Sequence, residues 1–426
     1  MSACTDHRRD ENATTTGDPA HPDSRASAST VRLSMIALFL GAFAVGTDGF
    51  MIPGLLPTIA GDFHTSTSTA AQLVTVFSIG YAVGAPLLAS ALQRADRRSV
   101  LTVGLLALAV SNAAAAVSPT LSVLFVARLA AALAAGAYSP TAAVVAARLA
   151  SEARRGRALS VITAGLTISI VTGVPLGNLV GQHWGWRTTF AGVAVLSIIL
   201  AVVLRFLLPH LAPDEARAGV RERLAALRRP GVPRVLATTG LGILAGYLAY
   251  TYVAPTSRAA GATTGALTIV LICFGVGAAV GTLLAGAAVD RYGQAPVVRT
   301  GALIQALALA GLAAATAANL RSGLAPAAAL FALLGVGSWT YNAPQQHRLV
   351  ELAPTDATLL VSLNSSAIYA GIGLSGALGA LTASAGAALG SGGGPALTCG
   401  VGAAVAVATI LVVGRRHSTN NGRQSA

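Results

Sequence analysis

The stretch LSMIALFLGAFAVGTDGFMIPGLLP, residues 33–57, decides the fold class of this chain. It has 25 residues and a single charged side chain, Asp48, and the apolar core of a bilayer takes about 20 residues of helix. The rest of the chain has the same character: 54% of its 426 residues are hydrophobic, 10% are charged and the mean hydropathy is +0.69. A soluble domain carries about 25% charged residues. We therefore predict an all-α membrane protein.

Further segments of the chain have similar length and composition, which gives twelve predicted transmembrane helices in all. Because this number is even, both termini lie on the same side of the membrane. The spans lie at roughly 33–57, 69–91, 100–118, 121–147, 158–181, 188–208, 235–255, 264–288, 297–317, 324–345, 358–383 and 396–414.

The placement of arginine predicts which side of the membrane the termini face. If the N-terminus is cytoplasmic, 24 of the 28 arginines fall in cytoplasmic tails and loops, and only Arg187, Arg258 and Arg321 fall outside. Cytoplasmic loops carry an excess of positive charge, so we predict a multi-pass protein of the cell membrane with both termini in the cytoplasm. The net charge of +13 then reflects attraction to the anionic cytoplasmic leaflet rather than nucleic-acid binding.

The longest internal loop divides the spans six and six. In the linker, Val220, Leu224 and Leu227 share one helical face, which favours a short helix lying on the inner leaflet; a merely solvated linker is the alternative. The predicted domains are a disordered cytoplasmic tail (1–31), a first six-helix bundle (32–208), a cytoplasmic linker (209–234), a second six-helix bundle (235–414) and a cytoplasmic tail (415–426).

The two halves repeat each other at a shift of 197 residues. Gly80-x3-Gly84 maps onto Gly277-x3-Gly281, and the turn Gln93-Arg94 maps onto Asp290-Arg291. Small residues at this spacing let membrane helices approach closely. Repeated six-span halves are the architecture of secondary transporters, whose binding site lies between the halves near the midplane.

The turn Asp290-Arg291-Tyr292-Gly293, which follows Gly286, resembles the cytoplasmic loop motif of the major facilitator superfamily, Gly-x3-Asp-Arg-x-Gly-Arg. The first-half copy is degenerate, because Gln93 replaces the acid and Asp96 replaces the second glycine. The resemblance implies twelve helices in two pseudo-symmetric halves. A topology signal made by arginine alone is the simpler interpretation of the turn. The resemblance instead implies a cytoplasmic gate that holds the outward-open state, formed by Arg94, Asp290, Arg291 and Gly293.

Three further segments resemble the twelve-span drug:proton antiporters of this superfamily, and most closely the arabinose-efflux and chloramphenicol-resistance type. They are residues 47–57 in span 1, Gly173-Val174-Pro175-Leu176-Gly177 in span 5 and residues 362–373 in span 11. The span 5 segment is similar to the antiporter motif of proton-coupled exporters, which implies that Gly173, Pro175 and Gly177 serve export. Alternatively, these residues simply loosen the helix.

Asp48 and Arg128 are the only charged residues deep inside the predicted spans. A charge there costs at least about 2.5–3.5 kcal/mol and is usually functional. In the fold that the resemblance implies, spans 1 and 4 are neighbours. Asp48 would then lie roughly 22 Å above the inner end of its span, and Arg128 roughly 12 Å below the outer end. In a core of about 30 Å the two side chains could meet.

This pair suggests a coupling site. Burial favours the neutral form of a carboxyl group and a nearby arginine favours the charged form, so movement of the arginine would switch protonation. We hypothesise that Asp48 carries the proton and that Arg128 tunes it. The alternative is a static ion pair, or an Asp48 side chain that caps a break in span 1 near Gly46 and Gly49.

Polar side chains among otherwise apolar helices are the candidates for the substrate pocket. Aromatic rings with a polar tip suit a planar, amphipathic compound, although each alone is equally well explained by helix packing or by the membrane interface. The candidates are Tyr138, Tyr247, Tyr250, Trp339, Asn342, Asn364 and Tyr369.

The predicted function is a proton-coupled antiporter that exports amphipathic small molecules, such as antibiotics, by alternating access. The alternative is export of a physiological metabolite, such as a purine or nucleoside, a sugar or an amino acid. A membrane sensor is disfavoured because no sizeable soluble domain is visible, and an enzyme because no nucleophile–base cluster is visible. We expect a monomer in the lipid bilayer whose partners are substrate and protons, with no cofactor beyond the proton gradient, no metal and no nucleic acid.

Overall fold

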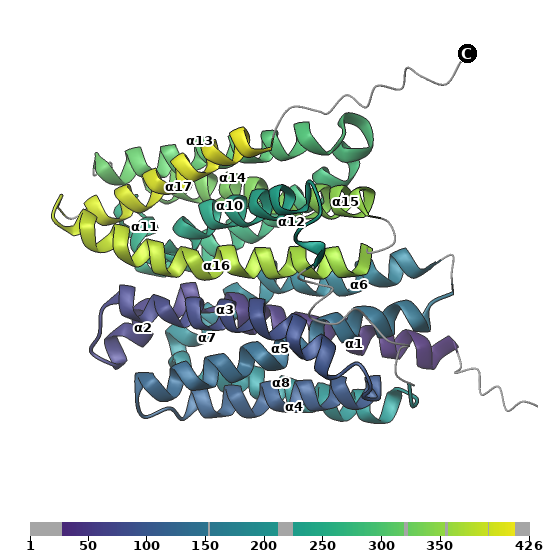
Figure 1. Ribbon diagram of the computed structural model, residues 1–426. Helices are drawn as coiled ribbons and strands as arrows, with labels where there is room; N and C mark the ends of the chain where they lie inside the picture. Colours follow the sequence, from purple (N-terminus) through teal and green to yellow (C-terminus); the bar gives the residue numbers. More distant parts are fainter. Residues whose placement is uncertain are drawn as a thin grey trace, which may run out of the picture.

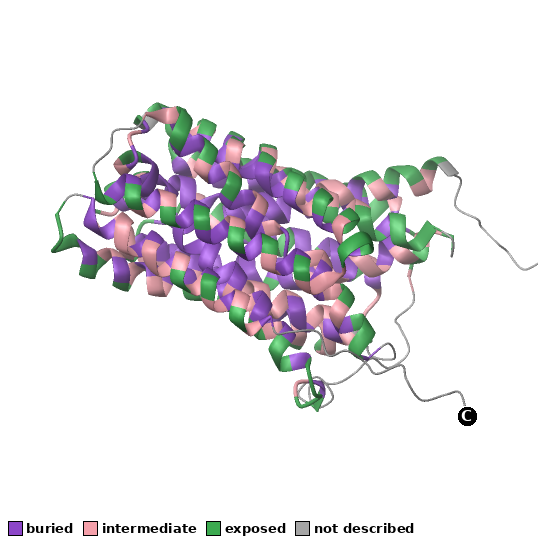
Figure 2. Ribbon diagram, turned by 90° about the horizontal axis from the view of Figure 1, so that it is seen from above, coloured by how far each residue is buried: buried purple, intermediate pink, exposed green. Residues whose placement is uncertain are grey.

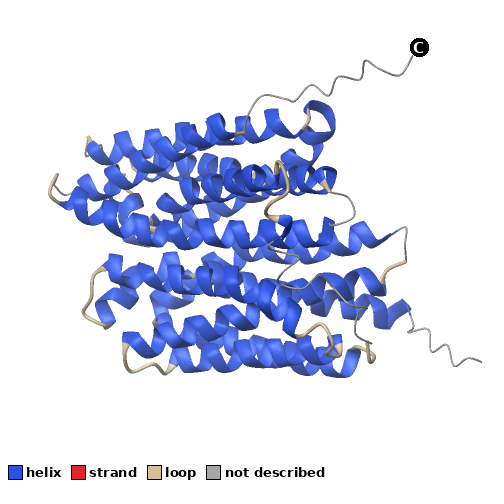
Figure 3. Ribbon diagram, in the orientation of Figure 1, coloured by secondary structure: helices blue, strands red, loops and turns tan. Residues whose placement is uncertain are grey.

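The computed structural model describes residues 28–151, 154–211, 225–318, 323–353, 357–390 and 392–413. These residues form helices, turns and loops, and no strand is present among them (Figure 3). Twelve helical segments in this part of the chain are long and apolar enough to cross a membrane, which confirms the predicted all-α membrane fold. The tail residues 1–27 and 414–426, and the linker positions Val220 and Leu224, lie outside the described residues.

The first half of the molecule runs from α1 to α8. Span 1 is divided into α1 (Ala28–Phe50) and α2 (Ile52–Asp62). Span 5 is divided into α6 (Arg155–Ile168), a π-helical segment η2 (Ser169–Gly173) and α7 (Val174–Trp184). The other spans are single helices, namely α3 (Thr67–Ala91), α4 (Arg97–Ala116), α5 (Leu121–Leu149) and α8 (Trp186–Leu207).

The second half runs from α10 to α17. Span 7 is divided into α10 (Val232–Thr251) and α11 (Val253–Ala259), and span 10 into α14 (Leu324–Trp339) and α15 (Asn342–Leu352). A short 3-10 turn, η3 (Thr264–Ala266), leads into span 8. The single helices are α12 (Leu267–Tyr292), α13 (Gln294–Ala317), α16 (Ala357–Ala387) and α17 (Gly393–Val412).

Four spans that the hydropathy pattern predicts as continuous are therefore interrupted. The last piece of each has a proline among its first three residues: Pro53, Pro175, Pro255 and Pro344. Proline has no N–H group and fits best in the first turn of a helix, so it favours a new helix start at these points. Proline alone does not force an interruption, because Pro86 and Pro140 lie inside the continuous helices α3 and α5. A window of mean hydropathy does not detect this, because an interruption changes no residue's hydrophobicity. Discontinuous helices are typical of transporter binding sites.

The two halves lie one above the other in Figure 1, with α1–α8 below and α10–α17 above. They meet along two seams, where α3 packs against α16, and where η2 and α7 pack against α12. Since the spans alternate in direction, both ends of the described chain lie on one side of the bundle, which we call the terminus side. The opposite side, where α2 and α11 lie in Figure 1, is the far side.

Small residues are used for close packing at equivalent places in both halves. Gly80 and Gly84 on α3 face leucine side chains of α5. Gly277 and Gly281 on α12 face the backbone of α14, at Ala332 and Val336. The second and fourth spans of each half therefore pack through the repeated motif, as the internal repeat predicts, and the backbones approach more closely in the second half.

The outer surface of the bundle is apolar as well as its core. Figure 2 shows buried residues along the middle of the bundle and exposed residues on its outside. Many exposed side chains are large and hydrophobic, including Val110, Val126, Leu283 and Leu411. A soluble monomer rarely exposes such a contiguous surface, so this surface fits the acyl chains of a bilayer.

Replacement of Gly277 by alanine is expected to destabilise the protein. A Cβ atom at Gly277 would overlap the backbone oxygen of Ala332 on α14, and overpacking of this kind costs about 1–3 kcal/mol. Gly286 on the same helix is the matched control, because nothing lies within 4 Å of a Cβ placed there. The midpoint of thermal unfolding in detergent should fall for Gly277→Ala and stay level or rise for Gly286→Ala. Equal midpoints would contradict the close packing of α12 on α14.

Candidate functional site

Asp48 and Arg128 meet inside the first half, as the estimate of their depths predicts. Nη1 of Arg128 lies 2.6 Å from Oδ1 of Asp48, and the two side chains are 1% and 0% exposed. Asp48 lies near the far-side end of α1, and Arg128 lies on the neighbouring α5. Removing both charges from water is costly, so such a pair persists only with good geometry and further hydrogen bonds.

The end of α1 supplies one of these further hydrogen bonds. The last carbonyl groups of a helix have no donor within the helix, and Pro53, just beyond the break, has no N–H to offer. Nη2 of Arg128 donates to the backbone oxygen of Asp48 at 3.0 Å. The hydroxyl of Tyr250 on α10 donates to the backbone oxygen of Phe50 at 3.2 Å. One residue from each half of the molecule therefore caps the same helix end.

Aromatic rings surround the arginine, while one carboxylate oxygen has no partner. The guanidinium carbon of Arg128 lies 4.3 Å from the ring centre of Phe77 and 5.8 Å from that of Phe190, within the range of a cation–π contact. In the described part of the chain, the buried atoms Oδ2 of Asp48, Nε of Arg128 and Oγ1 of Thr47 have no hydrogen-bond partner. Oδ1 thus binds the arginine, whereas Oδ2 has no hydrogen-bond partner among the described residues.

The glycines and proline of the span 5 motif lie where span 5 crosses α1. A Cβ atom at Gly173 would overlap the hydroxyl of Thr47, next to Asp48, and one at Gly177 would lie 3.1 Å from a methyl group of Thr189. Pro175 starts α7 directly after the π-helical segment η2. π-Helical turns and prolines are common causes of helix bends. The motif therefore brings a bent helix against α1 at the depth of the ion pair.

Three of the predicted pocket residues form one aromatic cluster around Phe50, which sequence reasoning did not select. The ring centre of Phe50 lies 6.4 Å from Tyr247 and 6.1 Å from Trp339, and Tyr247 lies 5.3 Å from Tyr250. Trp339 is partly exposed, and its buried Nε1 has no partner within the described residues. Phe50 is two residues from Asp48, so this cluster and the ion pair are adjacent across the interface between the halves.

The remaining pocket candidates lie elsewhere. Tyr138 is fully buried and donates from its hydroxyl to the backbone oxygen of Leu38 at 3.2 Å, so it joins α5 to α1 rather than lining a space. Asn364 is fully buried and accepts from Thr239 at 2.9 Å. Asn342 accepts from Gln346 at 2.8 Å within α15. Tyr369 on α16 stacks on Tyr81 of α3. The ring of Tyr138 also packs against Gly41 of α1. A role in substrate binding stays a prediction for these residues.

The predicted gate residues lie at the terminus side, at the ends of helices. Asp290 and Arg291 form the exposed last turn of α12, and Arg94 is exposed in the turn between α3 and α4. Gly293 has φ 79°, a left-handed conformation that favours glycine, and it ends α12 and starts α13. A gating role for these residues stays a prediction.

In the first-half turn, the hydrogen bonds that hold the turn together come from Asp96 and Arg97, which we did not select as site residues. Asp96 caps α4 by accepting from the backbone N–H of Ser99, and it also accepts from the backbone N–H of Leu211, both at 2.9 Å. Burial would raise the pKa of Asp96, but the hydrogen bonds from Ser99 and Leu211 outweigh it and hold this pKa below 3.8. Arg97, which is only 4% exposed, donates to the carbonyl groups of Leu92 and Gln93. These hydrogen bonds fix the degenerate turn at the start of α4.

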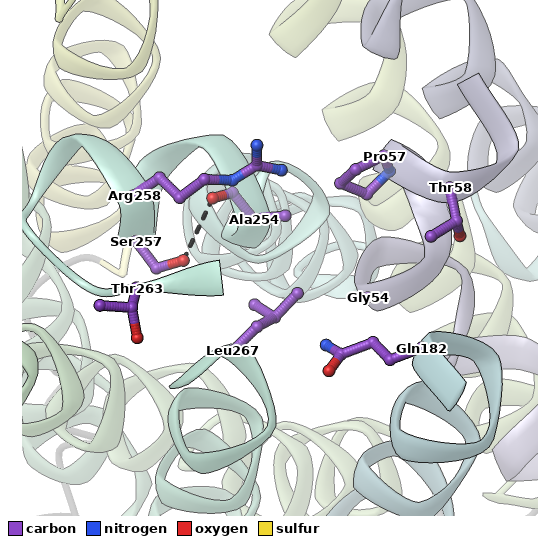
Figure 4. A pocket seen from close by; sticks show the side chains of 9 residues that line it. All are labelled: Gly54, Pro57, Thr58, Gln182, Ala254, Ser257, Arg258, Thr263 and Leu267. Atoms are coloured by element: carbon purple, nitrogen blue, oxygen red, sulfur yellow. Dashed lines mark hydrogen bonds between the residues drawn. The ribbon is translucent and has the colours of Figure 1, made fainter. Parts of the chain in front are cut away.

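The far side is closed between the halves. A pocket of about 50 Å³ lies where α2, α7, α11 and the start of α12 converge, and Figure 4 shows side chains from both halves around it. Binding sites for drug-sized ligands measure about 300–1,000 Å³, so this pocket is too small to hold such a ligand. It is a gap in the contact between the two halves. Its lining residues are Gly54, Pro57, Thr58, Gln182, Ala254, Ser257, Arg258, Thr263 and Leu267.

In this arrangement one carboxylate oxygen of Asp48 binds Arg128, and the other has no hydrogen-bond partner among the described residues. Burial favours the neutral form of any carboxyl group, whereas a neighbouring arginine favours the charged form, so the two effects oppose each other. In the described ranges, no group of three or more His, Cys, Asp or Glu side chains is arranged to hold a metal ion. Phe50 and Phe77 were missed because an aromatic ring in an apolar helix carries no signal beyond hydrophobicity.

Comparison with known proteins agrees with this architecture. A family model described as the Major Facilitator Superfamily matches residues 38–375. The chain is 32% identical to the inner membrane transport protein YdhP of Escherichia coli (strain K12) over 357 residues, which covers 84% of this chain and 90% of that protein. It is 36% identical to a chloramphenicol resistance protein of Streptomyces lividans over 266 residues, covering 61% of this chain and 67% of that protein.

Solved structures show the same fold. A D-xylose–proton symporter superposes with a TM-score of 0.71 at 19% identity, covering 89% of this chain and 97% of that chain. A bacterial homolog of the human lysosomal transporter Spinster, in an inward-facing and unoccupied conformation, gives 0.68 at 17% identity, covering 91% and 95%. At these identities the likeness concerns the arrangement of the helices alone.

Removal of the arginine charge is expected to cost more stability than removal of both charges. Arg128→Gln leaves the buried Asp48 carboxylate without a counter-charge, and breaking a buried pair costs about 3–5 kcal/mol. The double variant Asp48→Asn/Arg128→Gln leaves no charge in the site and should recover most of this loss. Thermal unfolding of the purified proteins at neutral pH measures the difference. A double variant no more stable than Arg128→Gln would show that the two residues do not act as a pair.

Proposed function

Because the chain belongs to the Major Facilitator Superfamily, we propose that it is a proton-coupled antiporter that exports amphipathic small molecules, such as antibiotics, by alternating access. The observation that carries this proposal is the buried Asp48–Arg128 pair, in which one carboxylate oxygen binds the arginine and the other has no partner among the described residues. The pair lies at the broken end of α1, and transporters typically bind substrate and ions at such breaks.

Protonation of Asp48 changes the energy of its surroundings. While Asp48 is ionised, the charge of Arg128 is balanced and its hydrogen bond is charge-assisted. Once Oδ2 holds a proton, Arg128 is a buried cation without a counter-charge, which is unfavourable. Any rearrangement that gives Arg128 another partner, or water, is then favoured. Arg128 and Tyr250 cap the same helix end from different halves. A movement of Arg128 would therefore also change the contact between the two halves.

Exchange requires that proton and substrate favour opposite orientations of the carrier. An antiporter achieves this when its protonated form and its substrate-bound form each stabilise a different state. The aromatic cluster of Phe50, Tyr247, Tyr250 and Trp339 adjoins Asp48, so a substrate held there would lie beside the proton site. Proximity of the two sites supports a direct competition between substrate and proton.

The substrate class rests on the lining of this cluster and on one relative. Aromatic rings with a few polar groups suit planar, amphipathic compounds, and a relative is a chloramphenicol resistance protein. YdhP, which the chain matches over a larger share of its length, is described only as a transport protein. Export of a physiological metabolite therefore remains the second candidate function.

Asp48→Asn is expected to abolish proton coupling. The amide keeps an oxygen for Arg128 but cannot exchange a proton, so substrate-driven proton movement in proteoliposomes, measured with a trapped pH dye and chloramphenicol as the first test compound, should fall at least tenfold. Asp62→Asn is the matched control, because Asp62 also belongs to span 1 but lies exposed on the far side. Unchanged proton movement in Asp48→Asn would rule out Asp48 as the carrier.

Expression in a drug-sensitive host separates the two candidate functions. An exporter of antibiotics should raise the minimum inhibitory concentration of at least one amphipathic compound severalfold, and a protonophore should cancel the increase. Asp48→Asn should behave like the empty vector, provided that its amount in the membrane equals that of the wild type. An unchanged tolerance across the panel, together with accumulation of one metabolite in the medium, would instead support metabolite export.

A further inference from the structure

One contact between the halves has no place in the function proposed above. The ring of Tyr81 on α3 stacks on the ring of Tyr369 on α16, with ring centres 3.7 Å apart and planes inclined by 23°. Tyr81 belongs to the first half and Tyr369 to the second, and Tyr81 is only 5% exposed. The stack therefore closes a point of the α3–α16 seam with one residue from each half.

The stack is continuous with the ion pair. Phe77 and Tyr81 lie one turn apart on the same face of α3, and the ring centre of Phe77 is 6.4 Å from that of Tyr369. Phe77 also faces the guanidinium group of Arg128 at 4.3 Å. α3 runs from the far side to the terminus side, so Tyr81 lies about 6 Å closer to the terminus side than Phe77. The rings thus form a layer on the terminus side of Arg128.

Burial along α16 changes at this layer. On the far side of Tyr369, Gly373 and Gly376 are buried and accept hydrogen bonds from Thr75 and Gln72 of α3, at 3.0 and 3.3 Å. On the terminus side, residues 365–368 are partly exposed, and Leu363 and Asn364 beyond them are buried. Tyr369 therefore lies between the partly exposed residues 365–368 and the buried part of the seam that is hydrogen-bonded to α3.

We propose that Tyr81 and Tyr369 form an aromatic partition that keeps water on the terminus side away from the Asp48–Arg128 pair. This proposal rests on the proposed function, because it assigns the partition to the control of proton access. Asp48 and Arg128 are 0% and 1% exposed, whereas residues 365–368 of α16, on the terminus side of Tyr369, are partly exposed. Tyr81 and Tyr369 act as positioning residues, since their rings hold the layer over the pair without binding the proton themselves.

The partition prevents a proton leak. If the rings part without substrate, a hydronium ion from the terminus side protonates Oδ2 of Asp48, and the same proton passes to water on the far side when that side opens. One O–H bond breaks and one forms in each step, so nothing else is consumed and the gradient drains. A stack that opens only together with the movement of the halves ties proton transfer to the transport cycle.

The test combines solvent access with proton leak. In a variant without Cys4, Cys273 and Cys399, Ser78→Cys places a thiol behind the stack, because Ser78 is 1% exposed and faces Gly373. Tyr369→Ala and Tyr81→Ala should each increase the rate of labelling by a small, water-soluble thiol reagent at least tenfold. Without substrate, they should also raise proton influx into proteoliposomes at least tenfold, and Asp48→Asn added to Tyr369→Ala should cancel that influx.

The phenylalanine variants are the matched controls. Tyr81→Phe and Tyr369→Phe keep the stacked rings, so both rates should stay within about twofold of the wild type. If an alanine variant does not fold, Tyr369→Leu also removes the stack while filling more of the space. Unchanged thiol labelling in all the variants without a stack would overturn the partition. Faster labelling without a proton leak would keep the partition and count against proton transfer through Asp48, which separates this inference from the proposed function.

Discussion

The structure depends on the need to satisfy one buried charge pair at the broken end of a helix. Asp48 and Arg128 are almost fully buried. Their mutual contact, the hydrogen bond to the backbone oxygen of Asp48 and the nearby rings of Phe77 and Phe190 offset the loss of water. The break at Met51 creates that acceptor, because it leaves the last carbonyl groups of α1 without donors in the helix. The arginine, the interruption of span 1 and the bent span 5 packed against it therefore belong to one arrangement.

The two halves share their packing but not their chemistry. Small residues join the second and fourth spans in both halves, and spans 1 and 7 are broken at equivalent places. The deep charges lie only in the first half, whereas most of the polar aromatic side chains near them lie in the second. A site assembled from both halves changes its shape when the halves move, which is what alternating access requires.

Much of the fold and of the candidate site could be predicted from the sequence, and physical reasons explain which features were predicted and which were missed. Asp48 and Arg128 were visible because a charge in an apolar segment is costly, and their meeting followed from helix rise and bilayer thickness. A break in span 1 was considered near Gly46 and Gly49, a few residues before its place at Met51, whereas the break at Pro344 was missed because hydropathy averages over it. Phe77 and Tyr81 were missed because one more ring in an apolar helix is not unusual, although their spacing of four residues places them on one face.

The hydrogen bonds that close the far side are of a kind that breaks at low cost. Thr75 and Gln72 donate across the seam to backbone oxygens within α16. When the halves separate, Gln72 retains its bond to Ser68, and Gly376 retains its bond from Tyr252 in its own half. A threonine hydroxyl without an external partner returns to the carbonyl four residues earlier in its own helix, as Thr141 does here. Opening the seam thus leaves few buried groups unpaired, whereas the ion pair of Asp48 and Arg128 stays inside one half. The two halves can therefore separate along this seam while the contact between Asp48 and Arg128 stays intact.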